Sequence, residues 1–361
     1  MDTDNTEGAP VLHVANASRI RRMLWIGFYT FALNILTLTL FRFWGRTHFR
    51  RQLWSDTTIG DDALEYTGRG IELFIGFLIA TFTIMIPTVV LLLLAQLLLG
   101  ETGALIAIFI LYFGLFWLMG VAVFLVRRYL ISRTRYRGVR FEQRGSAITY
   151  GWRAFGYLFA TALTLGWLSP FVRLRLSKYM WDNAYFGSEK IHFEETEEAK
   201  SEPVYKSFAV MWVGGIVLYT LFVTIMFNAM SAVELATGHI GVVLKFYGAG
   251  LVLGVLFALF AAWYQAVMTR KIVKSLSIAG VKASCDLTAI QLLRVWFLGV
   301  LLSIVTLGIG SLAFNMMIWR LIANHIRFDG EIDFEAIEQA ASTGPSQGEG
   351  IADGLDIGSA F

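Results

Sequence analysis

Long apolar runs separated by basic clusters dominate the pattern of this chain. No Lys or Arg occurs in the 57 positions from Gly70 to Val126, and Lys245 is the only one between Ser207 and Thr269. A bilayer core about 30 Å thick needs about 20 apolar residues per helix, so each stretch can cross a bilayer twice. The pattern therefore predicts two hairpins of full spans, over about 71–99 with 104–126 and about 208–230 with 244–268.

Three further apolar runs, Leu24–Trp44, Phe155–Phe171 and Val295–Ala313, have basic residues on both flanks. Loops rich in Lys and Arg stay on the cytoplasmic side, so a single crossing would place one basic flank outside. Each run also breaks in its middle, and first legs of about a dozen apolar residues are typical of re-entrant or interfacial helices. We interpret the three runs as re-entrant helix–break–helix hairpins; three ordinary kinked spans are the alternative.

The three runs are also internal repeats. Thr37, Thr164 and Thr306 occupy the same position of a short break, as in Leu163-Thr164-Leu165-Gly166 and Val305-Thr306-Leu307-Gly308. Each copy continues into a basic and aromatic helix, so the repeats extend over about 19–67, 146–194 and 289–334.

Short segments with a Gly between apolar residues follow every predicted descent into the cytoplasm. They lie at 58–60, 134–141, 185–193, 278–281 and 327–334, and a Gly in this setting signals a tight turn. The predicted fold is an all-α polytopic membrane protein with four full transmembrane helices, three re-entrant helix–break–helix hairpins and five small cytoplasmic β-hairpins. A polar N-terminal segment (1–18) precedes the membrane domain (19–339), and a disordered tail (340–361) follows it.

Composition agrees with a membrane protein. The chain is 56% hydrophobic and 16% charged, whereas soluble domains are about 25% charged. The net charge of +3 lies mainly at the ends of apolar runs, which does not fit a nucleic-acid partner. The single cysteine, Cys285, excludes an internal disulfide and a cysteine zinc cluster.

The break at 163–166, the following Pro170-Phe171, the Arg-rich helix after them and the segment Thr134–Phe141 together resemble the YjgN family. This is a family of bacterial inner-membrane proteins defined by a domain of unknown function (898), and the resemblance covers roughly 19–334. It implies a multi-pass protein of the inner membrane, and the basic flanks place both termini in the cytoplasm. In the first copy Thr39 and Phe43 replace Gly and Pro, and in the third Leu312 replaces Pro, so these two breaks are expected to bend less sharply.

Signatures of catalysis are missing from the sequence. It has no His-Glu-x-x-His, no P-loop and no Gly-x-Ser-x-Gly elbow. His192 with Glu194 and Glu195 fits no standard metal site. We therefore predict no catalytic residue, metal or cofactor, and do not expect an enzyme.

The breaks are the main functional candidates. A re-entrant hairpin leaves backbone N–H groups free at the start of its second leg, and such helix ends can hold anionic groups. Thr37, Thr164 and Thr306, with Arg42 or Arg153 nearby, are the candidate ligand-binding residues. The alternative is that each Thr hydroxyl only caps its helix end.

Two further sets of residues have candidate roles. Gly250 and Gly254 form a small-xxx-small pair that lets helices approach closely. Basic residues that alternate with aromatic ones predict an interfacial belt, for anchoring or for anionic lipid headgroups: Arg46, Arg50, Arg51, Arg173, Arg175, Lys178 and Arg320.

Two functions remain open from the sequence. The first is transport or lipid handling through the breaks, with anionic membrane lipids as partners. The second is a non-catalytic membrane scaffold or regulator, which acts on a membrane or cytoplasmic protein through its cytoplasmic layer. An intramembrane enzyme is the weakest reading.

Overall fold

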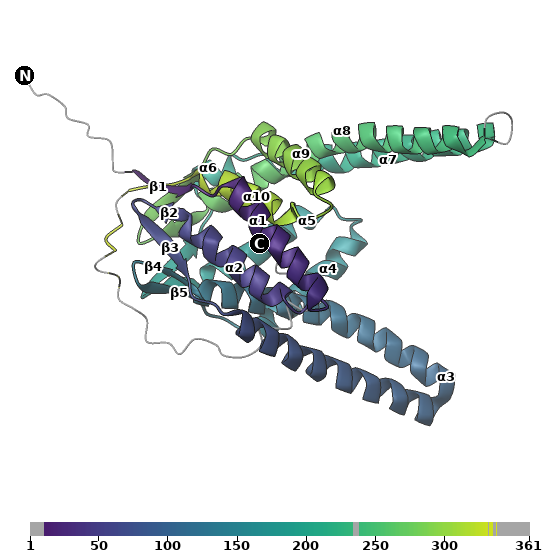
Figure 1. Ribbon diagram of the computed structural model, residues 1–361, viewed down its shortest axis with the longest axis horizontal. Helices are drawn as coiled ribbons and strands as arrows, with labels where there is room; N and C mark the ends of the chain where they lie inside the picture. The colour runs from purple at the N-terminus through teal and green to yellow at the C-terminus, as the bar shows by residue number, and fades with distance from the viewer. Residues whose placement is uncertain (1–10, 234–237, 331, 335–336, 338–361) are drawn as a thin grey trace, which may run out of the picture.

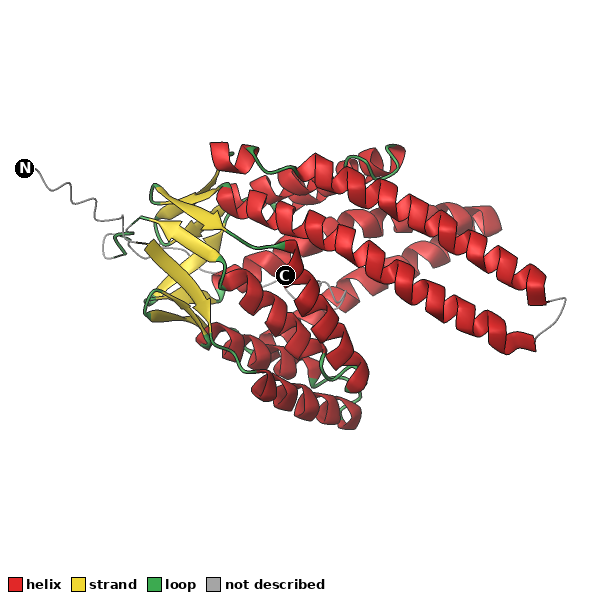
Figure 2. Cartoon of the chain, turned by 90° about the horizontal axis from the view of Figure 1, so that it is seen from above, coloured by secondary structure: helices red, strands yellow, loops and turns green. Residues whose placement is uncertain are grey.

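The computed structural model describes residues 11–233, 238–330, 332–334 and 337. In this part of the chain, ten short strands form one closed antiparallel barrel, in which each strand pairs with its neighbours in sequence and β1 pairs with β10. The strands gather at one end of the molecule and the helices at the other (Figure 2). The strands are β1 (Val11–Asn16), β2 (Thr57–Ile59), β3 (Asp62–Tyr66), β4 (Thr134–Tyr136), β5 (Val139–Gln143), β6 (Ala184–Phe186), β7 (Glu189–Phe193), β8 (Leu276–Ile278), β9 (Val281–Cys285) and β10 (Ile326–Asp329).

Tight two-residue turns join β2 to β3, β4 to β5, β6 to β7 and β8 to β9. Each turn contains backbone with positive φ, for example Arg137 (φ 48°) with Gly138 (φ 78°) and Ala279 (φ 48°) with Gly280 (φ 80°). Turns of this kind match the twist of the strands that they connect. Because they occupy one rim of the barrel, all helical connections leave from the opposite rim.

Five helical insertions rise from that rim, and each returns to the strand beside the one it left. They are α1 (Ile20–Leu36) with α2 (Arg42–Ser55); α3 (Gly70–Ser132); α4 (Ala147–Leu163) with α5 (Ser169–Asp182); α6 (Glu197–Lys200), α7 (Val204–Val233) and α8 (Gly238–Lys274); and α9 (Ala289–Val305) with α10 (Ser311–Ala323). Helix α3 has non-helical backbone at Gly100 and folds back there (Figure 1). Three helical stretches among the described residues are long and apolar enough to cross a membrane: Gly70–Ser132, Glu197–Asn228 and Val243–Lys274.

The predicted all-α fold with four full spans and separate small hairpins was wrong. An isolated two-stranded hairpin is marginally stable and leaves unpaired edges, whereas here all strands join into one ring. The ring is closed by Val11–Asn16, which lies in the predicted polar N-terminal segment and pairs with both β2 and β10. The predicted hairpin at 327–334 does not form, because its first residues pair with β1 and β9 instead.

Apolar side chains fill the barrel. Alternate residues point inward, and those near the turn rim form one buried cluster with Ile332 and Ile337 from beyond β10: Leu64, Tyr136, Phe186, Ile278 and Val281. Near the helix rim, the rings of Trp54 and Trp319 stack at 5.4 Å. Their indole N–H groups donate to the hydroxyls of Thr134 and Thr57. The helices are thus fastened directly to the barrel rim.

The three helix breaks have the same backbone geometry. At the second, the N–H of Gly166 donates to Thr161 O at 2.7 Å and that of Leu165 to Ala162 O at 3.0 Å, which is the Schellman pattern of a helix C-terminus. The equivalent bonds occur at the first and third breaks. Leu38, Leu165 and Leu307 share φ values of 49–50°. At the first break Thr39 adopts φ 73° where the other copies have Gly at φ 89° and 90°, so the local backbone is alike in all three copies.

This geometry makes Thr39 a strained residue. Left-handed backbone costs a non-glycine residue about 1–2 kcal/mol, and a β-branched residue suits it poorly. Thr39→Gly should therefore raise the free energy of unfolding by about 1 kcal/mol, after the entropy cost of an added glycine. The check is urea unfolding in detergent. The matched exchange Gly166→Thr should lower stability instead, and a Thr39→Gly variant that is less stable than the wild type would contradict the assignment.

Helices approach most closely at glycines other than the predicted pair. Among the described residues, a Cβ at Gly254 would meet nothing within 4 Å, and one at Gly250 would meet Phe222 at an ordinary 3.8 Å, so this part of the chain shows no close packing at the pair. On α1, by contrast, a Cβ at Gly27 would lie 2.7 Å from the carbonyl oxygen of Ile309, beside the third break. The α1 helix therefore packs against backbone at Gly27.

Gly27→Ala should lower the free energy of unfolding by about 1–3 kcal/mol, as overpacking does, because a backbone carbonyl cannot rotate away as a side chain can. Gly254→Ala is the matched control, with free space around the new methyl group and a helix propensity gain of up to about 1 kcal/mol. Thermal unfolding of both variants in the same detergent compares them. Equal melting temperatures would show that α1 does not pack against the third break.

Candidate functional site

A groove opens where the helices meet the barrel, between α5 and the start of α7. It encloses about 810 Å³, and residues from α5, the end of β7, α6, α7 and α8 line it. We call it the α5–α7 groove. It lies at the barrel end of α7, where the apolar stretch 197–228 begins.

The spacing of residues on α5 explains one wall. Phe171, Leu174, Arg175 and Lys178 line the groove, and positions i, i+3, i+4 and i+7 lie on one helix face. The floor is apolar, because Phe193 and Val204 are each only 3% exposed. The groove thus has an apolar floor next to a basic face of α5.

Several cations line the groove together with the carboxylates of Glu194 and Glu195. The guanidinium of Arg175 lies 5.1 Å from the ring centre of Phe171, and Lys206 begins the opposite wall on α7. Within the described part of the chain neither makes an ion pair, whereas Lys178 Nζ lies 3.0 Å from Asp182 Oδ2 and donates to Phe193 O at 2.6 Å. Arg175 and Lys206 are exposed, and they are therefore the cations that can accept an anionic ligand.

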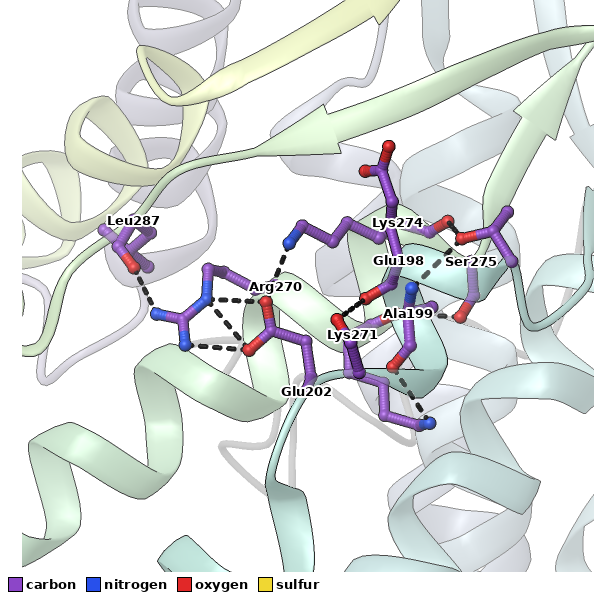
Figure 3. Close-up of polar contacts among 10 residues, drawn as sticks. Glu198, Ala199, Glu202, Arg270, Lys271, Lys274, Ser275 and Leu287 are labelled. Carbon is purple, nitrogen blue, oxygen red and sulfur yellow. Dashed lines mark hydrogen bonds and ion pairs between the residues drawn. The ribbon is translucent and has the colours of Figure 1, made fainter.

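A buried ion cluster holds the base of the groove in place (Figure 3). The carboxylate of Glu202 receives both arms of Arg270, at 2.9 and 2.8 Å, and Lys274 Nζ at 2.8 Å. The Glu202 side chain is 7% exposed, against 21% for Arg270 and 19% for Lys274. Arg270 and Lys274 are four residues apart on α8, so both point at the same carboxylate.

Further polar bonds tie this cluster to the barrel. Arg270 also donates to Leu287 O at 2.7 Å, just after β9, and Lys271 donates to Ala199 O at 3.2 Å. The hydroxyl of Thr196 donates to Lys274 O at 3.0 Å, and the N–H of Glu194 donates to Ser275 O at 2.8 Å. The result is a rigid junction, on which α7 and α8 keep a fixed position relative to the groove.

The three break threonines make local bonds. Thr37 and Thr306 each donate to a carbonyl four residues earlier at 2.7 Å, and accept from an N–H four residues later at 3.0 and 2.7 Å. Thr164 donates to Ala160 O at 2.9 Å and accepts from Leu168 N–H at 3.3 Å. These are the bonds of the capping alternative, and binding of an anion at these residues stays a prediction.

The guanidinium groups of the two arginines predicted to lie near the breaks pack against aromatic rings. The Arg42 guanidinium is 4.9 Å from the ring centre of Phe43 and 5.0 Å from that of Phe77. That of Arg153 is 4.6 Å from the ring centre of Tyr179. Among the described residues, neither arginine makes a hydrogen bond to a break threonine.

Of the seven predicted belt cations, only Arg175 and Lys178 line the groove. Arg51 donates to Gly68 O at 3.2 Å, Arg173 to Gln265 Oε1 at 2.6 Å and Arg320 to Ser18 O at 3.2 Å. Arg46 and Arg50 also interact with other residues. Arg50 is only 7% exposed, and the role of these residues in an interfacial belt stays a prediction.

Sequence reasoning missed Glu202 and Lys206 as site residues. Lys206, Arg270, Lys271 and Lys274 lie at the basic ends of the second predicted hairpin. Glu202 gave no separate signal in the sequence, because it is the last of five glutamates between positions 194 and 202.

Among the described residues, no group of three or more His, Cys, Asp and Glu side chains could hold a metal ion. No curated protein and no solved structure matches the chain. The profile of one protein family matches residues 17–354, which confirms the resemblance drawn from the helix breaks and the Thr134–Phe141 segment. The chain belongs to the family described as "Bacterial protein of unknown function (DUF898)".

Proposed function

We propose that this is an integral membrane protein of the bacterial inner membrane that binds anionic phospholipid in the α5–α7 groove. The role is lipid handling without catalysis. The observation that carries it is the pairing of an apolar floor with two unpaired cations, Arg175 and Lys206, at the base of an apolar helix. Lipid headgroups lie at that height when the helix spans the bilayer.

The exposed surface of the helices supports a membrane location. Leu97, Leu98 and Phe227 are 80%, 76% and 74% exposed, and contiguous exposed apolar surface marks membrane or protein contacts. The tips of the breaks also support a membrane location, because Leu38, Leu165 and Leu307 are 84%, 77% and 89% exposed. A tip in water would favour Gly or Asn in left-handed backbone; leucine there suits tips that enter lipid from the barrel side.

Both sides of the groove contribute to recognition. A basic residue near an anionic leaflet contributes about 1 kcal/mol, and an acyl chain that enters the groove adds about 0.8 kcal/mol for each of its CH₂ groups that becomes buried. A free phosphate would gain only the electrostatic contribution from the basic residues. The proposal therefore requires a lipid with a negative headgroup, and not the headgroup alone.

Lipid binding can be measured by the thermal shift of the purified protein in detergent. Phosphatidylglycerol should raise the melting temperature more than phosphatidylcholine, and inorganic phosphate should have no comparable effect. Replacing both Arg175 and Lys206 by Gln should remove the difference between the two lipids. The control Lys282→Gln changes an exposed cation on β9 outside the groove and should retain it.

Equal shifts by both lipids in the wild type would overturn the proposal. An effect of phosphate as large as that of phosphatidylglycerol would replace the lipid by a soluble anion. A double variant that still distinguishes the two lipids would move the lipid site away from the groove.

The proposed orientation places the barrel and both termini in the cytoplasm. Single cysteines at Thr102 and at Gly187 then report opposite sides, and only Thr102→Cys should react with a membrane-impermeant maleimide on intact cells. The native Cys285 is 5% exposed, and burial raises the pKa of its thiol, so less reactive thiolate is present. Labelling at Gly187→Cys in intact cells would reverse the orientation.

A further inference from the structure

The turn rim of the barrel is covered by residues that belong to no strand. Beyond β10, Ile332 and Ile337 are 7% and 6% exposed and pack in the same cluster as Leu64, Tyr136 and Phe186. Phe334 lies against the same surface, with ring centres 5.1 Å from Tyr136 and 6.1 Å from Phe186. We call Ile332, Asp333, Phe334 and Ile337 the C-terminal segment.

The width of the barrel explains why such a segment is needed. Eight strands make a barrel just wide enough for its own side chains to fill. Ten strands enclose a wider space, and at the helix rim the stacked pair Trp54 and Trp319 occupies it. At the turn rim the side chains of the C-terminal segment serve this purpose. Without them, an apolar cup lined by Tyr136, Phe186, Ile278 and Val281 would face solvent.

The C-terminal segment contacts the barrel in the way that a bound peptide ligand would. It follows Gly330, at φ 152°, and it meets the barrel through separate side chains placed in one apolar surface. One polar residue adds specificity: the Arg137 guanidinium lies 5.1 Å from the ring centre of Phe334. Arg137 is held by an ion pair with Asp62, so this cation is positioned independently of the segment.

We propose that the turn rim of the barrel is a peptide-binding cup, and that the C-terminal segment is its built-in and releasable ligand. The recognised chemistry is a short peptide with aliphatic, aromatic and aliphatic side chains at the spacing of Ile332, Phe334 and Ile337. The tether favours the seated state, because a short covalent link creates an effective concentration in the millimolar range. Release opens an apolar surface on the side opposite the helices. This site is independent of the lipid groove.

The test cuts the tether after the full chain has folded. A specific protease site is inserted after Gly330, and a control site after Gly344. A fluorescent peptide with the sequence of residues 331–345 is then added, and its binding is followed by anisotropy. Cutting at the first site should raise binding of the peptide at least about tenfold, because it then competes with an untethered fragment. Cutting at the control site should not change binding.

Peptide and barrel variants define the specificity. A peptide with Phe334→Asp should bind at least about tenfold more weakly to the cut protein. In the uncut full chain, Phe334→Asp should increase binding of the wild-type peptide, because it weakens only the tethered competitor, while Lys282→Gln should not. The second measurement needs no insertion and so holds even where the inserted site disturbs folding.

Retention of the severed segment through gel filtration, with no exchange for the labelled peptide, would overturn the proposal and make the segment a permanent part of the core. Equal binding of the wild-type and Phe334→Asp peptides would also overturn it. Neither result bears on the phosphatidylglycerol measurement.

Discussion

Replacing Tyr136 by Ala is expected to lower the free energy of unfolding by about 4 kcal/mol. Loss of a large aromatic side chain from a core costs about 3–5 kcal/mol, and Tyr136 is 1% exposed in the barrel interior. Its ring contacts Phe186 and Phe334, and its hydroxyl donates to Ile59 O at 2.7 Å. The variant therefore loses packing between three parts of the barrel and the hydrogen bond to Ile59 O.

The control is Tyr185→Ala. Tyr185 precedes Phe186 on β6 and so points to the outer face, where the Arg144 guanidinium lies 4.1 Å from its ring centre. Its loss should cost about 1 kcal/mol, the size of an exposed cation–π contact. Urea unfolding of both variants in detergent gives the comparison. Similar losses would show that the barrel interior is not a packed core.

Replacing Glu202 by Gln is expected to cost about 3 kcal/mol. Removing one member of a buried ion pair costs about 3–5 kcal/mol because the remaining charge stays without a partner. Here Arg270 and Lys274 both lose their carboxylate, but they remain 21% and 19% exposed, which puts the loss at the lower end of that range. Because the cluster lies under the groove, the variant should also bind phosphatidylglycerol less well.

Glu197→Gln provides the matched control, on the short helix α6 five positions before Glu202. Its carboxylate pairs with Lys200 at 2.8 Å but is 89% exposed, and exposed pairs contribute about 0–1 kcal/mol. Thermal unfolding across a range of salt concentrations distinguishes the effects of the two substitutions, because salt screening weakens exposed ion pairs far more than buried ones. A loss for Glu202→Gln no larger than that for Glu197→Gln would mean that solvent reaches the cluster.

Local features of the molecule were readable from the sequence alone. The apolar stretches 70–126 and 207–269 predicted long helices, and the repeated Leu-Thr-Leu-Gly pattern predicted the helix breaks. The Gly-centred turns between β2 and β3, β4 and β5, β6 and β7, and β8 and β9 were predicted as well. All of these depend on residues within about one helix turn or one hairpin of each other, where backbone preference and hydrophobic period decide the structure.

Only the tertiary structure decided the barrel, the groove and the ion cluster. β1 meets β10 through pairs such as Leu12 with Phe328, and no local signal in either short strand indicates a partner more than 300 positions away. The same holds for Glu202 with Arg270 and for Phe334 with Tyr136. Such contacts form because strand edges must be paired, buried charges must be neutralised and a wide barrel interior must be filled by the segments that the ring brings together. The amino-acid sequence shows that these groups need partners, but not which residues the partners are.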